Sequence, residues 1–206
     1  MKRFTSLRIV LLLAVSIISF GYFTVVAEAF PIEYRFGGTT EVFGAFNDTE
    51  FNNGSFLVSI LGDTDNVDIT DPLNPFIDGL IGTITFGAPE IGINAGTFLN
   101  PLYVFLDQLN EIVGFGNTDP DPGIGIIDLF DIYAPGQGLG AYDLKSYFGP
   151  ITGSFLFTSD MNLDIGLLSI EDANSPTFAA VPEPTTMLLL GSGLLGLLGF
   201  RRRFRG

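Results

Sequence analysis

Between residues 30 and 180 the apolar residues come in short runs, four to eight long, that Gly, Asn, Asp and Pro interrupt. A buried helix needs a longer stretch, whereas a strand is complete in five or six residues. The runs therefore predict strands rather than helices. Ten strands are expected, over residues 32–36, 41–46, 55–61, 80–86, 103–106, 112–115, 126–133, 153–158, 165–170 and 177–180.

Short strands joined by short turns predict a single all-β domain, an antiparallel β-sandwich-like fold, because parallel strands would need long crossover connections. Asn52-Asn53-Gly54 predicts a hairpin turn, since Asn and Gly tolerate positive φ. The segment 102–113 is ambiguous, because its apolar residues also fit helical spacing. A hairpin that turns at residues 108–110 is the favoured interpretation.

Phenylalanine supplies the bulk of the expected core. The chain has 21 Phe but no Trp and no Cys, so neither indole rings nor disulfides stabilise the fold. The alternating pairs Phe43/Phe46 and Phe155/Phe157 are expected in the core or between facing sheets, rather than as platforms for a ligand.

Composition also excludes several kinds of chemistry. Without Cys or His the chain has no thiol nucleophile, no Ser-His-Asp triad and no ordinary zinc or haem site. Between residues 30 and 182 the cations are Arg35 and Lys145, in a chain with 23 acidic residues, so binding to nucleic acid is excluded. We expect a protein that is not an enzyme. Carboxylate-based glycan hydrolysis is a less favoured alternative, because the sequence marks no acid and base pair.

The first 29 residues are typical of a signal peptide. Basic residues at positions 2, 3 and 8 precede an apolar run over 9–18, and Ala27-Glu28-Ala29 places small residues where signal peptidase reads them. An uncleaved N-terminal membrane anchor is the alternative, since the apolar stretch to Val26 approaches spanning length. The Ala-x-Ala pattern favours cleavage after Ala29.

The C-terminal segment has three parts: Pro182-Glu183-Pro184, an uncharged stretch over 187–200, and an arginine cluster. A helix over residues 185–200 would be about 24 Å long, which is short for a hydrocarbon core of about 30 Å and suits a transient anchor. The cluster should stay on the cytoplasmic side and leave residues 30–184 outside. It consists of Arg201, Arg202, Arg203 and Arg205.

These three parts resemble a PEP-CTERM sorting signal of Gram-negative bacteria, with the motif itself at Pro182, Glu183 and Pro184. The resemblance covers the last 26 residues. It implies that a membrane-embedded exosortase cuts at or near the motif and releases the protein to the cell surface or the extracellular matrix. Species with such proteins commonly make exopolysaccharide, which is therefore an expected partner.

Two acidic loops are the candidate metal-binding segments. Asp63, Asp65, Asp68 and Asp71 lie within nine residues and supply the oxygen ligands that Ca²⁺ prefers, although their spacing is not that of an EF-hand. The second loop, residues 119–123, is followed by Asp128 and Asp131. Solvated loops that keep an exported protein soluble are the favoured interpretation. The prediction is therefore no obligatory cofactor, with calcium possible at the first loop.

The chain is thus expected to comprise a signal peptide (1–29), a β-rich exported domain (30–180) and a sorting signal with a transmembrane helix (181–206). The predicted function is that of a structural protein at the cell surface or in the matrix, associated with exopolysaccharide or biofilm. A calcium-assisted or lectin-like adhesion module is the alternative.

Overall fold

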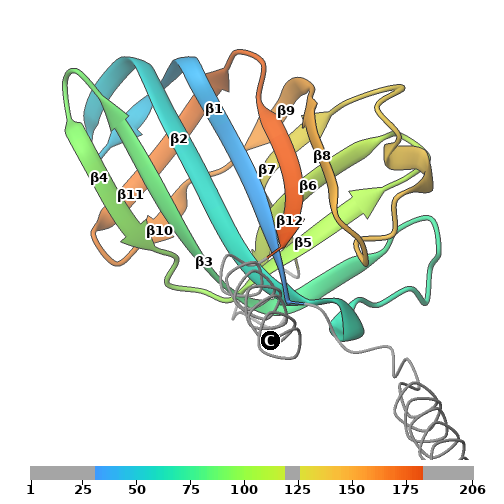
Figure 1. Ribbon diagram of the computed structural model, residues 1–206. Helices are drawn as coiled ribbons and strands as arrows, with labels where there is room; N and C mark the ends of the chain where they lie inside the picture. Colours follow the sequence, from blue (N-terminus) through green and yellow to red (C-terminus); the bar gives the residue numbers. More distant parts are fainter. Residues whose placement is uncertain (1–30, 119–125, 183–206) are drawn as a thin grey trace, which may run out of the picture.

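The computed structural model describes residues 31–118 and 126–182 (Figure 1). The described chain is built from β-strands and two short 3-10 helices, η1 (Thr64–Asn66) and η2 (Leu139–Ala141). The expected signal peptide and C-terminal helix lie outside the described residues. The strands are β1 (Pro31–Phe46), β2 (Thr49–Asp63), β3 (Phe76–Ala88), β4 (Gly92–Thr97), β5 (Leu102–Asp107), β6 (Ile112–Thr118), β7 (Ile126–Tyr133), β8 (Phe148–Thr152), β9 (Ser154–Thr158), β10 (Met161–Leu163), β11 (Gly166–Ala173) and β12 (Thr177–Pro182).

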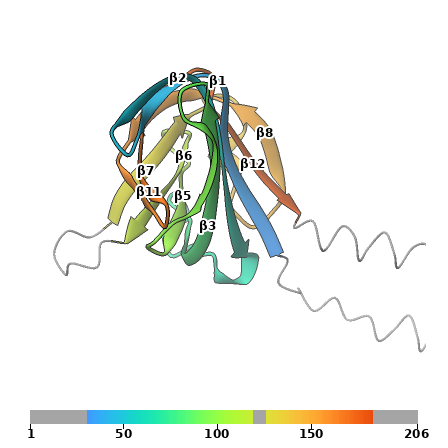
Figure 2. The same cartoon turned by 90° about the vertical axis from the view of Figure 1, so that its left-hand side faces the viewer.

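All twelve strands belong to one antiparallel sheet. The main order is β10-β11-β1-β2-β3-β5-β6-β7-β9, with β4 beside β3, and with β12 between β1 and β8. The prediction of an all-β antiparallel domain is confirmed. The sheet forms two facing layers, as a sandwich does, but the layers are not separate sheets (Figures 1 and 2).

Two strand bends join the layers. The first lies in β3, where residues 81–87 pair with β2 while Phe76, Ile77 and Leu80 pair with β5. The pairing shifts between Ile77 and Leu80, at Gly79, whose φ of +69° favours glycine. A strand that changes sheets at a bend requires no extra connection, so one continuous sheet folds over its own core.

The second bend is at Gly153, between β8 and β9. β8 pairs with β12 in one layer, and β9 pairs with β7 in the other. A Cβ at position 153 would lie 2.4 Å from the Ile132 side chain and 2.5 Å from the Tyr133 carbonyl oxygen, so only glycine fits there. The sequence predicted one strand over 153–158, and the structure adds β8 before this bend.

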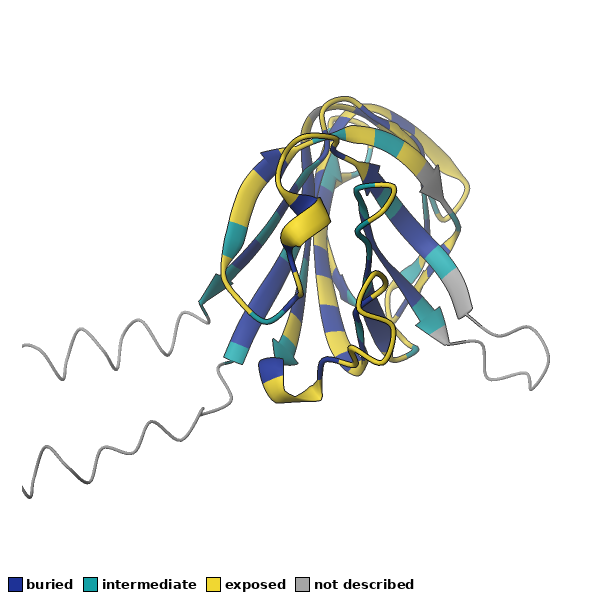
Figure 3. Cartoon of the chain, turned by 90° about the vertical axis from the view of Figure 1, so that its right-hand side faces the viewer, coloured by how far each residue is buried: buried dark blue, intermediate teal, exposed yellow. Residues whose placement is uncertain are grey.

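The core between the layers is a cluster of phenylalanine rings. The Phe36 ring lies 5.0 Å from the Phe115 ring and 5.0 Å from the Phe178 ring, between centroids, and Phe115 stacks on Phe130 at 5.7 Å. All four side chains are fully buried. In Figure 3 buried and exposed residues alternate along several of the strands, as expected where one face of a strand packs on the core.

The prediction for the alternating phenylalanines is partly wrong. Phe46 and Phe155 are partly buried and pack against the core, as expected. Phe43 is 36% exposed and lies on the surface instead. The cause is a change of pairing register in β1 near this residue, which alters the face that the side chain occupies.

The predicted hairpin turn at Asn52-Asn53-Gly54 is wrong. These residues lie inside β2, and the turn between β1 and β2 is at Asn47 and Asp48, whose φ angles are +47° and +64°. Asn53 also has positive φ, +53°, but as an irregularity within the strand. By contrast, the predicted hairpin over 102–113 is confirmed by the pairing of β5 with β6.

The remaining differences concern short or extended strands. Expected strands 32–36 and 41–46 are the two halves of the single strand β1. Strands β4, β8 and β10 were not predicted, because each is short or rich in Gly and polar residues and carries little apolar signal.

The ring cluster generates a stability prediction. Replacing Phe36 by Ala removes a fully buried ring that contacts both layers, so the free energy of unfolding should fall by about 3–5 kcal/mol. Phe43→Ala, at the surface, should cost less than about 1 kcal/mol. Urea unfolding of the purified exported protein measures both. Equal losses for the two variants would contradict the proposed core, and Phe36→Leu provides a milder variant if the alanine variant does not fold.

Candidate functional site

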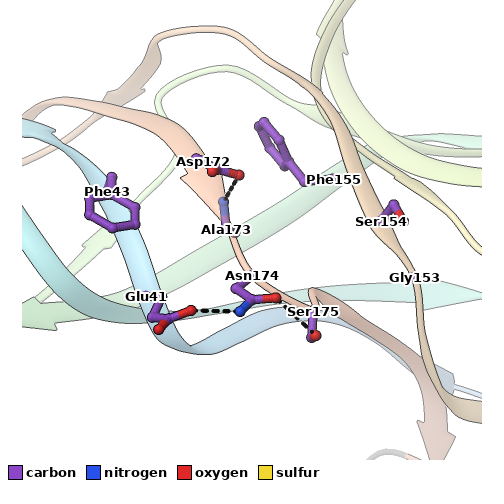
Figure 4. Close-up of a pocket in the computed structure, with 9 residues that line it drawn as sticks. All are labelled: Glu41, Phe43, Gly153, Ser154, Phe155, Asp172, Ala173, Asn174 and Ser175. Carbon is purple, nitrogen blue, oxygen red and sulfur yellow. Dashed lines mark hydrogen bonds between the residues drawn. The ribbon is translucent and has the colours of Figure 1, made fainter.

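The first candidate site is a surface pocket of about 350 Å³ at the junction of three segments (Figure 4). It forms where β1 changes its neighbour, from β12 over residues 32–37 to β11 over residues 42–46. The register with β2 shifts between Gly38 and Val42, so the intervening residues of β1 bulge. The pocket is lined by Glu41, Phe43, Gly153, Ser154, Phe155, Asp172, Ala173, Asn174 and Ser175.

Polar side chains in this pocket are held by one another. The Asn174 amide donates to the Glu41 carboxylate at 2.6 Å, and the Ser175 hydroxyl donates to the Asn174 side-chain oxygen at 3.2 Å. Glu41 and Ser175 both have positive φ, +54° and +50°. Such conformations are costly for residues other than glycine and persist only where the surroundings impose them. These hydrogen bonds connect the three side chains into one polar wall of the pocket.

Two aromatic rings form the apolar part of the pocket. In Figure 4 the rings of Phe43 and Phe155 stand on either side of Asp172, whose carboxylate accepts from the Ala173 N–H at 2.8 Å. The lining contains two carboxylates and neither Lys nor Arg. Apolar rings beside carboxylate acceptors can hold a ligand that is apolar on one face and rich in hydroxyl or ammonium donors on another.

The second candidate is a carboxyl pair on the outer face of the β5-β6-β7 segment. The Tyr103 hydroxyl donates to Asp128 Oδ1 across Gly116 of β6. Asp131 lies opposite Gly114, one row along the sheet. A register shift between Phe115 and Gly116 places both carboxyl groups on this face, because it inserts one extra residue between them in β7.

The environment of this pair is polar but poorly solvated. Asp131 Oδ1 is buried and accepts no hydrogen bond among the described residues. Burial, and secondarily the nearby Asp128 carboxylate, raise the pKa of Asp131 to about 7. Burial and the hydrogen bond to Asp128 also raise the pKa of Tyr103. The sequence pattern indicates both aspartates but not Tyr103, because the partner of Tyr103 is 25 residues away in the chain.

The predicted calcium residues lie at the end of β2 and in the segment after it, where three of the four carboxylates accept from a backbone N–H two residues further along the chain. Asp63 accepts from the Asp65 N–H, Asp68 from the Thr70 N–H, and Asp71 from the Leu73 N–H. Hydrogen bonds from the Thr70 side chain and N–H lower the pKa of Asp68, and hydrogen bonds from the Asn74 side chain and the Leu73 N–H lower the pKa of Asp71. Within residues 31–118 and 126–182, no group of three or more acidic side chains lies together as metal ligands would. Calcium binding at Asp63, Asp65, Asp68 and Asp71 stays a prediction.

The third feature is the end of β12, where the candidate sorting motif begins. Pro182 lies opposite Ile32 of β1, and Val181 lies opposite Glu33. The described chain therefore enters and leaves the domain on neighbouring strands at one end of the sheet, as Figure 2 shows for β1 and β12. Glu183, Pro184, the arginine cluster at 201–205 and the signal-peptidase residues Ala27 and Ala29 lie outside the described residues. In the described part of the chain, no helix has the length and apolarity to cross a membrane.

Comparison with known proteins identifies this end of the chain. The family model of the PEP-CTERM protein-sorting motif matches residues 180–203. The chain carries a PEP-CTERM sorting motif. The match includes the last three residues of β12, so the PEP-CTERM motif starts within the folded sheet. No curated protein and no solved structure matches this chain.

The raised pKa of Asp131 predicts a pH-dependent stability. Between about pH 4 and pH 7 the folded protein keeps this carboxyl protonated while the unfolded chain releases the proton, so this group makes stability fall as pH rises through that window. Asp131→Asn should remove that component and gain stability relative to wild type at pH 8 but not at pH 4. Urea midpoints at both pH values measure it, with exposed Asp78→Asn as the control. A difference between variant and wild type that does not change with pH would contradict the assignment.

Proposed function

We propose that the chain is an exported protein that exosortase processes at the PEP-CTERM motif, and that it acts at the cell surface or in the extracellular matrix in association with exopolysaccharide. The sorting motif at residues 180–203 carries this proposal. In this proposal signal peptidase and exosortase are transient partners, and the inner membrane holds the precursor only until it is cut.

The domain suits this role chemically. Its surface is strongly anionic, since the described residues contain only two cations, and one of them, Arg35, pairs with Glu33 at 2.6 Å. A strongly acidic domain is expected to stay soluble outside the cell. Because it has no cysteine, its folding does not depend on the redox conditions there. The role we propose is structural rather than catalytic.

The processing step is tested by changing the motif. Replacing Pro182, Glu183 and Pro184 by Ala should leave the signal-cleaved precursor in the inner membrane, because the cutting enzyme loses its recognition sequence. A blot of membrane and extracellular fractions, with an antibody to the β-domain, measures it. The matched control is a triple alanine change at the exposed residues Asp71, Pro72 and Leu73, far along the chain from the motif.

Two outcomes of that blot would contradict the proposal. One is wild-type protein found only in the inner membrane with its arginine cluster intact, which would make the C-terminal segment an ordinary anchor. The other is normal release of the alanine variant.

A second candidate function, a lectin-like adhesion module, rests on the pocket at Glu41 and Phe43. Sugars present a C–H face that packs on aromatic rings and hydroxyls that donate to carboxylates. Because Glu41 and Asp172 line the pocket and no cation does, it favours neutral or amino sugars over sulfated sugars or uronates. This candidate also gives the exopolysaccharide association a specific site.

Phe43→Ala should weaken glycan binding about three- to tenfold, because it removes one ring of the pocket. Leu57→Ala, an exposed apolar residue of β2 outside this pocket, is the matched control. A glycan array, followed by titration of the best neutral or amino glycan with calcium or with chelator, measures binding and its calcium dependence. Equal glycan affinity of wild type and Phe43→Ala would contradict glycan binding at this pocket. Unchanged affinity in chelator would contradict a calcium-assisted mode of binding.

A further inference from the structure

The last residues of β12 belong both to the folded domain and to the sorting motif. Six consecutive residue pairs join β12 to β1, from Gly37 opposite Thr177 to Ile32 opposite Pro182, without a register shift. The motif match starts at Ala180. There is therefore no spacer between the sheet and the sequence that the processing enzyme has to read.

The two parts of β12 are held with different strength. Residues 177–180 pair with β1 on one side and with β8 on the other, and Phe178 is fully buried against Phe36. Val181 and Pro182 extend past the last pairing with β8, which is Ala180 opposite Phe148, and both are only half-buried. Separating Val181 and Pro182 from β1 should therefore cost little free energy, whereas separating Phe178 would expose the core.

Processing enzymes bind their substrates as extended chain, and the backbone groups of a bound strand pair with the enzyme. The backbone N–H and C=O groups of β12 that are already paired with β1 are not free to pair with an enzyme. Resting on the processing proposed above, we propose that the β1-β12 ladder gates the cut. Val181 and Pro182 must leave β1 before exosortase acts, and the doubly paired residues 177–180 stop the opening there.

A disulfide across the ladder tests the gate. Glu33→Cys with Val181→Cys places two thiols on directly opposite residues, where Cα atoms in antiparallel strands are about 4.5–5.5 Å apart, within the range that a disulfide spans. The chain has no other cysteine, so no competing pair forms. The matched control is Leu61→Cys with Ile81→Cys, which locks β2 to β3 in the same row of the sheet, because Leu61 lies opposite Glu33.

The full-length precursor is followed in cells by a blot of membrane and extracellular fractions, with and without dithiothreitol. We expect the oxidised Glu33→Cys/Val181→Cys protein to stay uncut in the membrane, reductant to restore its release, and the Leu61→Cys/Ile81→Cys control to be released in both conditions. Because the same variant is compared oxidised and reduced, loss of the Arg35 ion pair affects both forms equally.

A second variant separates the gate from a general defect. A Gly-Ser-Gly-Ser insertion between Val181 and Pro182 of the locked protein gives the motif a spacer, so it should be cut without reductant. Release of the locked protein at the wild-type rate, or failure of the spacer to restore cutting, would overturn the gate while leaving the processing proposal intact. If wild type itself is never cut, the processing proposal fails and the gate fails with it.

Discussion

The contact of Phe36 with Phe115 and Phe178 is the interaction on which the rest of the structure depends. It joins β1 to β6 in the opposite layer and to β12 beside it, so one ring connects the first described strand, the middle of the chain and the last strand. With no disulfide available, burial of such rings is the main source of stability. The sheet bends at Gly79 and Gly153, so both layers of one continuous sheet lie against these rings.

Strand β1 also determines where the pocket and the end of β12 lie on the surface. β1 pairs with β12 in its first half and with β11 in its second, and the bulge between the halves creates the pocket at Glu41 and Phe43. Its first residues hold the end of β12, where the sorting motif begins. The pocket and the start of the sorting motif therefore lie at opposite ends of the first half of β1, and the position of each is set by the pairing register of this strand.

Much of this could be predicted from short-range sequence patterns. Apolar runs predicted most of the strands, and the Pro-Glu-Pro motif with its apolar stretch and arginines predicted the sorting signal, because both signals are contiguous in the chain. Features set by distant pairing could not be predicted. Asn53 looks like a hairpin residue but sits in β2 because the register with β1 places the turn at Asn47 and Asp48. Phe43 and Tyr103 take their roles from partners far along the sequence.

The proposed processing has two steps: the exported chain loses its N-terminal signal peptide and is then cut at the C-terminal sorting motif. Intact-mass measurement of the protein recovered from the extracellular fraction tests it most directly. We expect the mass of a chain that begins at Phe30 and ends at or beside Pro182-Glu183-Pro184, without the arginine cluster. A released or membrane-bound form that retains Arg201, Arg202, Arg203 and Arg205 as the sole product would contradict it.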